Sequence, residues 1–416
     1  MQRRWWVILA ILLMACSGGD DSTGPRAEIT QSTAPPPLVS TTNPVTTPDA
    51  LANPTPDSIE PRDYILGPEA APVTIVMYGD FQCGRCARYA RDLEILRGEY
   101  PDDLRLIWRH LPDTQTNDKA ALALQAAEAA AAQGRFWDMH AVLFTTQSQW
   151  LDQNTDEFKA TLVDYARTAG LDAAAFAEAL DDERYLPLVD EYRTQADALG
   201  IVGIPTLLIN GELLNDRDDL FGLQRLVELA LLDERHFEAP PPMAIDSSHD
   251  YRAVIETEKG DITIDLLEQQ APIAVNNFVF LVEQGWYTNT SFFLVIPDFY
   301  AQAGDPSETG RGYPGYHLEG EHTNGLTFDQ AGVVAMSHPS GELAQNGSQF
   351  FITYGPLPEH ETEWDGQYTI FGLVTDGLDI VQNLTPRNPG DPLHFPNPPQ
   401  GDVITAIRIV VDEDLP

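Results

Sequence analysis

Residues 79–91 read GDFQCGRCARYAR and contain two cysteines, Cys83 and Cys86, separated by two residues. An apolar, β-branched run of strand length, Val73–Tyr78, comes directly before them. The segment Ala87–Leu96 follows with helical composition and without glycine or proline. The pattern therefore predicts that a buried strand turns into a helix at the cysteine pair.

The predicted position of Cys83, at the N-terminus of a helix, would activate its thiol. Unpaired backbone N–H groups and the helix macrodipole favour negative charge there, so we expect a lowered thiol pKa and a thiolate near neutral pH. Arg85 lies between the cysteines and should act in the same direction. Cys86 lies one helical turn away and can form a disulfide with Cys83. We therefore interpret the pair as redox-active.

Two other uses of a Cys-x-x-Cys pair remain open on the sequence alone. One is half of a zinc site, and the other is a purely structural disulfide. A zinc site needs two further ligands, but the chain has only three cysteines, and the third, Cys16, lies in an N-terminal apolar segment. Redox chemistry is therefore the favoured interpretation.

The composition bounds the size and the surface of the protein. The chain has 416 residues, enough for two ordinary domains, and its 43% hydrophobic content supports real cores. Its 64 acidic residues outnumber 24 basic ones, which gives a formal net charge of −40. Such a surface repels nucleic acid and anionic lipid head groups, so we exclude nucleic-acid binding.

Residues 1–16 have the features of a targeting segment. Arg3 and Arg4 precede the apolar run Trp5–Ala15, whose eleven residues are too few to span a bilayer as a stable helix. The segment ends in Leu-Met-Ala-Cys at Cys16, which resembles a bacterial lipobox. That resemblance implies lipidation of Cys16 and a lipoprotein anchored to a bacterial membrane. A plain secretory signal is the alternative, and both place the mature chain outside the cytoplasm, where disulfides persist.

Two segments of linker composition separate the remaining parts of the chain. Residues 17–60 are rich in Pro, Ser and Thr and predict a disordered tether, and residues 237–249 form a second, proline-containing linker. We therefore expect one folded domain at 61–236 and another at 250–412.

The first domain combines strands and helices in an α/β pattern. A second strand is expected at Leu104–Trp108, and Gly203–Glu212 returns to strand with a hairpin signal at Asn210-Gly211. Helices are expected at Lys119–Gln133, Phe136–Phe144, Thr155–Gly170, Ala173–Leu180, Tyr185–Leu199 and Asp218–Leu232. Most of these helices form an insertion between the strands. We interpret His110 and His140 as structural, because their neighbours are apolar or aromatic.

This domain resembles the DsbA-like thioredoxin-fold oxidoreductases. The resemblance covers essentially all of 61–236 and is carried, in the family's order, by Phe81–Cys86, Gly134–Trp137, Gly203–Thr206 and Ile209–Gly211. It implies thiol–disulfide exchange, with Cys83 forming the mixed disulfide and Cys86 resolving it.

In that family the proline that matches Pro205 is cis and faces the cysteine pair, and the loop with Ile204 holds a substrate peptide. The resemblance therefore implies catalytic roles for Cys83, Cys86 and Pro205 and a substrate-binding role for Ile204. The partners that it implies are unfolded or partly folded secreted polypeptides and a redox partner protein. Neither a cofactor nor a metal is expected.

The second domain starts with a β-hairpin and continues as a mostly β structure. Arg252–Thr257 and Asp261–Leu266 alternate around a turn that contains Gly260, and Ala271–Gln284 predicts one helix with Pro272 in its first turn. Short strands and loops of Gly, Pro and Asn follow, which is typical of a barrel or sandwich.

The same domain resembles the cyclophilins over about 250–412. The residues that carry this resemblance are Ala271–Phe278, Phe292–Asp305 as a central strand, Asn346–Thr353 and Asp365–Gly372. It implies a closed eight-stranded barrel capped by two helices, and peptidyl-prolyl cis–trans isomerisation. The whole chain is thus expected to be multidomain, with an α/β thioredoxin-like domain and a mostly β barrel.

The cyclophilin resemblance also implies a substrate site. Phe299, Phe351 and Tyr368 would line a proline pocket, Gln302 and Gln349 would hydrogen-bond the peptide, and Trp364 would lie at the rim. Cyclophilins carry a catalytic arginine where this chain has Leu294, and leucine has no hydrogen-bond donor. Three functions remain open: a bifunctional foldase, an oxidoreductase whose second domain only binds prolyl peptides, and a non-enzymatic envelope scaffold.

Overall fold

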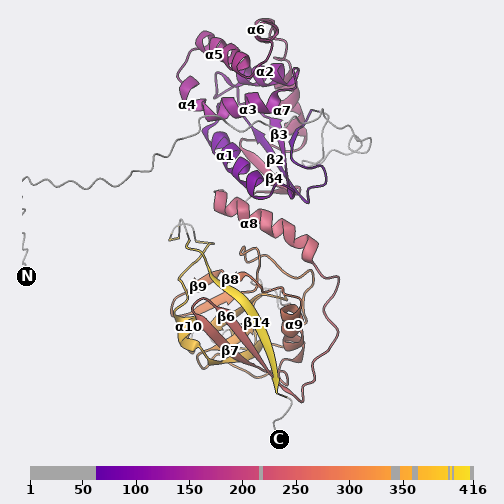
Figure 1. Cartoon of the computed structure of the whole chain (residues 1–416), viewed down its shortest axis with the longest axis vertical. Coiled ribbons are helices and arrows are strands. Elements are labelled where there is room, and N and C mark those ends of the chain that lie inside the picture. Colours follow the sequence, from indigo (N-terminus) through magenta and orange to yellow (C-terminus); the bar gives the residue numbers. More distant parts are fainter. Residues whose placement is uncertain are drawn as a thin grey trace, which may run out of the picture. The chain divides into compact units, whose positions relative to one another are not determined.

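The computed structural model describes residues 62–214, 219–338, 347–357, 364–391, 394–395 and 398–412 (Figure 1). The expected targeting segment, the lipidation site Cys16 and the expected tether lie outside these residues. Within the described ranges, no helix is both long enough and apolar enough to cross a membrane.

The first domain is built on a five-stranded sheet in the order β1-β3-β2-β4-β5. Its strands are β1 (Tyr64–Leu66), β2 (Val73–Gly79), β3 (Leu104–His110), β4 (Thr206–Ile209) and β5 (Glu212–Leu213). β2 and β3 are parallel, and the other neighbours are antiparallel. β2 is buried along its whole length, as its continuous apolar, β-branched sequence predicts.

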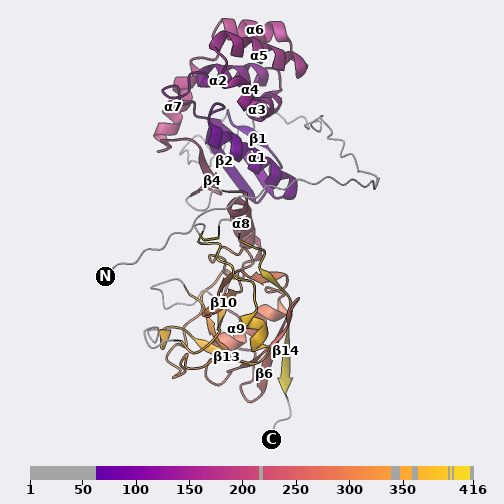
Figure 2. The same ribbon diagram turned by 90° about the vertical axis from the view of Figure 1, so that its left-hand side faces the viewer.

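Helix α1 (Gly84–Glu99) follows β2, and α8 (Leu220–Leu231) follows β5 and continues into the short 3₁₀ helix η1 (Leu232–Arg235). Between β3 and β4 lie α2 (Ala120–Ala131), α3 (Phe136–Thr145), α4 (Gln147–Trp150), α5 (Thr155–Thr168), α6 (Ala173–Asp181) and α7 (Leu188–Ala198). Both views show α2, α5 and α6 grouped at one end of the domain, away from β4 (Figures 1 and 2). The expected helical insertion is therefore confirmed, and its helices begin and end close to the predicted residues.

Three features of this domain differ from the expectation. The short strand β1 and the one-turn helix α4 carry no periodic signal and were not expected. The seventh helix starts at Leu188 and not at Tyr185, because Pro187 has no N–H to continue a helix from the preceding turn. The hairpin signal at Asn210-Gly211 is confirmed, because this turn, with φ angles of 47° and 86°, joins the antiparallel strands β4 and β5.

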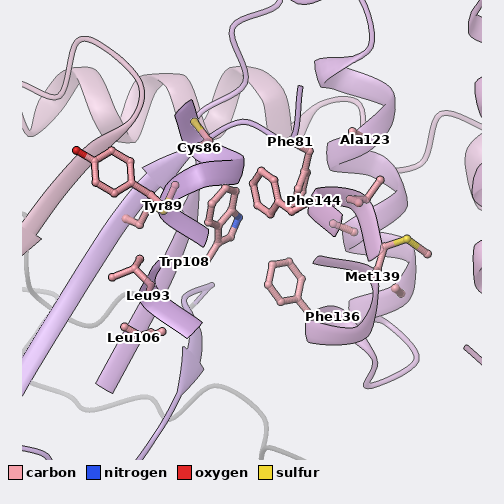
Figure 3. Close-up of a cluster of buried hydrophobic side chains, with 14 of the residues drawn as sticks. Phe81, Cys86, Tyr89, Leu93, Leu106, Trp108, Ala123, Phe136, Met139 and Phe144 are labelled. Carbon is pink, nitrogen blue, oxygen red and sulfur yellow. The ribbon is translucent and has the colours of Figure 1, made fainter. Parts of the chain in front are cut away.

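One apolar core joins the sheet, α1 and the inserted helices. Phe81 lies directly before the cysteines, Trp108 belongs to β3, and Phe144 belongs to α3. Their ring centroids lie 5.0–5.5 Å apart. Figure 3 shows these three rings together, above Phe136. The segment that carries the cysteines is thus fixed to the core by its own aromatic side chain.

The second domain is a nine-stranded antiparallel sheet in the order β8-β14-β6-β7-β13-β11-β12-β10-β9. Its strands are β6 (Asp250–Thr257), β7 (Gly260–Leu266), β8 (Thr290–Phe292), β9 (Leu294–Ile296), β10 (Tyr300–Ala303), β11 (Val333–Met336), β12 (Phe350–Thr353), β13 (Ile370–Asp376) and β14 (Asp402–Asp412). Its helices are α9 (Pro272–Glu283) and α10 (Leu378–Gln382). β6, β7 and β14 lie side by side in Figure 1.

The sheet is a nearly closed barrel, because its two edge strands are consecutive in the chain. Only Phe293 separates β8 from β9, so one interrupted strand supplies both edges. The expected barrel is confirmed, and this interruption gives nine strands in place of eight. The expectation of one central strand over Phe292–Asp305 is wrong: Pro297-Asp298 makes a turn, with Asp298 at φ 61°, and β9 and β10 pair as a hairpin around it.

Candidate functional site

Cys83 is the N-cap residue of α1, in extended backbone conformation with φ −76° and ψ 118°. Its sulfur accepts a hydrogen bond from the backbone N–H of Cys86 at 3.1 Å. The sulfur thus occupies the place that a Ser or Asp oxygen takes at an ordinary N-cap. The helix N-terminus is where a negative group is most stabilised, so the geometry favours the thiolate.

Both thiols are free, and their surroundings push their pKa values in opposite directions. The pKa of Cys83 is lowered to about 7, first by the hydrogen bond with the Cys86 thiol and also by the backbone N–H groups of Cys86 and Arg85. Burial raises the pKa of the Cys86 thiol, which has no exposed surface. Cys83 is therefore the sulfur that can attack, and Cys86 is the sulfur protected from solvent.

Two side chains that the sequence analysis missed hold the backbone before Cys83. The Asp80 carboxylate accepts the backbone N–H of Gln82 at 2.7 Å and that of Asp113 at 3.0 Å. The Gln82 side chain donates to Asp118 at 2.8 Å and accepts the backbone N–H of Lys119 at 2.7 Å. These bonds tie the cysteine loop to the segment after β3. The sequence holds no signal for the three bonds to Asp113, Asp118 and Lys119, because they join residues more than thirty positions apart.

The structure brings Pro205 to the same end of the sheet as the cysteines. The Ile204–Pro205 peptide bond is cis. Pro205 directly precedes Thr206, which pairs with Tyr78 near the end of β2 from which the cysteine loop leaves. Ile204 is partly buried, and Val202, two residues before it, has 84% of its surface exposed. This loop offers apolar side chains beside the cysteine end of the sheet.

The two histidines of this domain lie inside the aromatic core. Burial lowers the pKa of His110 and that of His140 to about 3, so both rings are neutral at physiological pH. His110 accepts the Trp108 indole N–H at 3.2 Å and lies 3.5 Å from the Glu128 carboxylate. Among the described residues, no three His, Cys, Asp or Glu side chains gather in a way that could hold a metal ion.

A second cluster of candidate residues lies on the barrel of the second domain. The rings of Phe299, Phe351 and Tyr368 surround Trp364, with centroids 5.3, 5.5 and 5.0 Å from its own. On the adjacent strand, Gln302 pairs in register with Phe351. The cluster therefore combines an aromatic wall with a polar edge.

The polar edge is a chain of amide hydrogen bonds. Gln302 Nε2 donates to Gln349 Oε1 at 2.8 Å, and Gln349 Nε2 donates to the Gly312 carbonyl at 2.9 Å. Each bond fixes which end of the amide faces its neighbour. All six substrate residues expected in this domain thus lie in one connected group.

Comparisons with known proteins match both halves of the chain. A family model described as thioredoxin matches residues 60–228, and one described as cyclophilin-type peptidyl-prolyl cis-trans isomerase matches residues 252–407. Peptidyl-prolyl cis-trans isomerase cypE of Dictyostelium discoideum is 44% identical over 134 residues, which are 31% of this chain and 81% of that protein. Peptidyl-prolyl cis-trans isomerase-like 1 of Neurospora crassa is 36% identical over 39% of this chain and 95% of that protein. The chain belongs to the cyclophilin family.

Other similarities are partial or weaker. Na(+)/H(+) antiporter NhaA 1 of Mycolicibacterium gilvum is 36% identical over 171 residues, which are 40% of this chain but only 26% of the antiporter. A Cryptosporidium parvum cyclophilin solved with the dipeptide Ala-Pro is 34% identical over 38% of this chain and 98% of its own, with a TM-score of 0.34. Oxidised BdbD of Bacillus subtilis is 22% identical over 40% of this chain and 91% of its own, with a TM-score of 0.36.

The chain therefore joins the domains of two kinds of enzyme. The first is a thioredoxin-like domain of the thiol–disulfide oxidoreductase type, and the second is a peptidyl-prolyl isomerase domain of the cyclophilin type.

The cyclophilin domain carries Leu294 beside its polar edge. Leu294 pairs with Gln302 across β9 and β10, so both side chains lie on the same face of the sheet. Leu294 is partly buried, and its side chain has no donor to offer a bound peptide.

Two further residues of the cyclophilin site were missed by the sequence analysis. Ser337 Oγ accepts a hydrogen bond from Gln302 Nε2 at 3.1 Å. The His338 ring stacks on Tyr368, with centroids 4.4 Å apart and an interplanar angle of 23°. A hydrogen bond from the N–H of Met336, at the end of β11, to the Thr369 carbonyl brings these segments together. This pairing is long-range, and no local pattern in the sequence announces it.

The hydrogen bond from the Cys86 thiol predicts a shift in the reactivity of Cys83. In the Cys86→Ala variant this donor is lost, so the midpoint of the alkylation rate against pH should rise from about 7 by roughly one pH unit. Cys86→Ser retains a hydroxyl donor and is the matched control. Its alkylation midpoint should lie nearer to that of the parent than the midpoint of Cys86→Ala does. Iodoacetamide kinetics on the reduced protein measure both, and equal midpoints in the Ala and Ser variants would contradict the assignment.

Proposed function

We propose that the chain is an extracytoplasmic protein-folding factor that combines thiol–disulfide exchange with peptidyl-prolyl isomerisation. The observation that carries the proposal is the Cys83 sulfur, which caps α1 and accepts the Cys86 N–H at 3.1 Å, in a chain that also carries a cyclophilin domain. Disulfide formation and prolyl isomerisation are both slow steps of folding. One chain with both domains could act on both steps in the same client.

The exchange follows from the asymmetry of the two sulfurs. In the oxidising direction, a client thiolate attacks Cys83 Sγ of the Cys83–Cys86 disulfide, the S–S bond breaks, and Cys86 leaves as a thiolate that takes up a proton. A second client thiolate then attacks the client sulfur of the mixed disulfide and releases Cys83 as a thiolate. The client is oxidised to a disulfide, and the protein is left with two reduced cysteines.

A redox partner protein completes the cycle by exchanging a disulfide with the reduced pair. In the reducing direction, the Cys83 thiolate attacks a client disulfide, and Cys86 resolves the mixed disulfide. The lowered pKa of Cys83, caused first by its hydrogen bond with Cys86, supports both directions because the thiolate is both the nucleophile and the better leaving group.

The isomerase half requires an apolar grip on proline and polar groups that favour the twisted amide. The X-Pro bond must cross a barrier of about 18–20 kcal/mol. The aromatic group of Phe299, Phe351, Trp364 and Tyr368 supplies apolar surface, and the amides of Gln302 and Gln349 supply hydrogen bonds. We therefore assign prolyl peptides of unfolded or partly folded polypeptides as the ligands of this site.

A second function is favoured by one observation, the pairing of Leu294 with Gln302. Without a donor at that position, the transition state loses a hydrogen bond while the pocket for the proline ring stays intact. The cyclophilin domain would then bind prolyl peptides for the thioredoxin-like domain with little turnover of its own.

The location outside the cytoplasm rests on the N-terminal sequence. The apolar run that ends in Leu-Met-Ala-Cys at Cys16 supports a lipid anchor on a bacterial membrane. The acidic surface, with its net charge of −40, suits a domain held away from anionic head groups by a tether. The clients would then be secreted polypeptides.

Insulin reduction by dithiothreitol tests the exchange function. The parent chain should accelerate precipitation of the insulin B chain, and Cys83→Ser should reduce the rate to that of dithiothreitol alone. Both proteins carry Cys16→Ser, so that the pair supplies the only thiols of the chain. Equal rates with and without Cys83 would instead favour a non-enzymatic scaffold.

A protease-coupled assay on a proline peptide shows whether the cyclophilin domain isomerises prolyl peptides or only binds them. Leu294→Arg restores a donor and should raise kcat/KM by about a hundredfold if the missing donor limits catalysis. Leu294→Met, which fills similar volume without a donor, is the matched control. A parent that already turns over as fast as the arginine variant would refute the binding-only function.

Cell fractionation tests the anchor. In a bacterial host the parent should sediment with membranes, whereas Cys16→Ser should appear in the soluble fraction because position 16 no longer carries a thiol for lipidation. Recovery of both proteins in the soluble fraction would rule out the lipid anchor and leave a plain secretory signal.

A further inference from the structure

Gln147 is a buried amide from the helical insertion that reaches into the cysteine loop. It opens α4, and only 8% of its surface is exposed. Its Nε2 donates to the carbonyl oxygen of Phe81 at 2.7 Å and to that of Cys83 at 3.1 Å. One side chain thus bridges two backbone carbonyls of the loop that joins β2 to α1.

The carbonyl of Cys83 has a special position in this loop. It also accepts the N–H of Ala87 at 3.1 Å, the bond with which the ladder of α1 begins. The direction of this carbonyl depends on the rotation ψ of Cys83, which also sets how the following N–H groups lie relative to the Cys83 sulfur. Since Gln147 holds the carbonyl, it constrains the bond between Cys86 N–H and Cys83 Sγ.

The other restraints on the loop act on different atoms. Asp80 holds the N–H of Gln82, the Gln82 side chain bonds to Asp118 and Lys119, and the Phe81 ring packs against Trp108 and Phe144. Gln147, in contrast, belongs to the helical insertion and donates a hydrogen bond to the backbone of Cys83 itself.

We propose that Gln147 is a positioning residue for disulfide exchange: from the helical insertion it fixes the backbone of Cys83, and so sets the reactivity of the Cys83 sulfur. This inference rests on the proposed exchange function of the pair. The helical insertion would thereby act directly on the reactive cysteine. A buried amide is costly to leave unpaired, so the two bonds from Gln147 to the loop should persist.

Gln147→Met tests the role, since methionine fills a similar length without a donor. The loss of both bonds should relax the loop, and the thiolate-to-thiol ratio of Cys83 at pH 7 should fall by about tenfold. Gln149→Met is the matched control, because Gln149 lies exposed on the same helix. The ratio is measured from the thiolate absorbance near 240 nm as a function of pH. The sample is the reduced full-length chain carrying Cys16→Ser.

Circular dichroism of each variant shows whether it is folded, and Gln147→Leu decides the test if the methionine variant is not folded. Leucine lacks the amide donor and adds no charge, so it should also lower the ratio. A folded Gln147 variant with the parent's ratio, or an equal fall in Gln149→Met, overturns the proposal. A parent chain that fails to reduce insulin would refute the exchange function instead, and the titration would still report on positioning.

Discussion

The hydrogen bond from the Cys86 N–H to the Cys83 sulfur joins the fold of the first domain to its chemistry. It exists because β2 ends at Gly79 and α1 begins at Gly84, which leaves Cys83 at the N-cap with its sulfur over the first turn. An N-cap favours a charged acceptor, and the same helix buries Cys86 one turn later. A single strand-to-helix turn therefore produces one ionisable and one protected sulfur from two identical residues.

The second domain meets a different constraint if it acts on prolyl peptides as proposed. A proline ring needs apolar contact, and the amide next to it needs hydrogen bonds that strengthen as it twists. The aromatic group around Trp364 and the amide chain from Gln302 to Gly312 would provide these two kinds of contact. Leu294 pairs with Gln302 at that edge and offers no donor, so under the proposed function binding and catalysis would be separable at this position.

The sequence predicted the cysteine segment because its cause is local, although the local turn at Pro297-Asp298 was missed. The β-branched run before Cys83 and the helical composition after it were sufficient to predict the strand, the turn and the N-cap. Long-range contacts left no such signal. Gln147 lies 64 positions from Cys83, and Ser337 lies 35 positions from Gln302, so only the folded chain shows that they touch. The break at Phe293 was also missed, and it shows only in the folded barrel, where β8 and β9 lie at the two edges of the sheet.

The reduction potential of the Cys83–Cys86 pair tests the central claim most directly, because stabilisation of the Cys83 thiolate favours the reduced form. Equilibration of the full chain with glutathione buffers of known ratio gives this potential. A stabilised thiolate predicts a value less negative than about −300 mV, above the range of structural disulfides. A pair that stays fully oxidised, with a potential well below that value, would show that the helix terminus does not activate the sulfur.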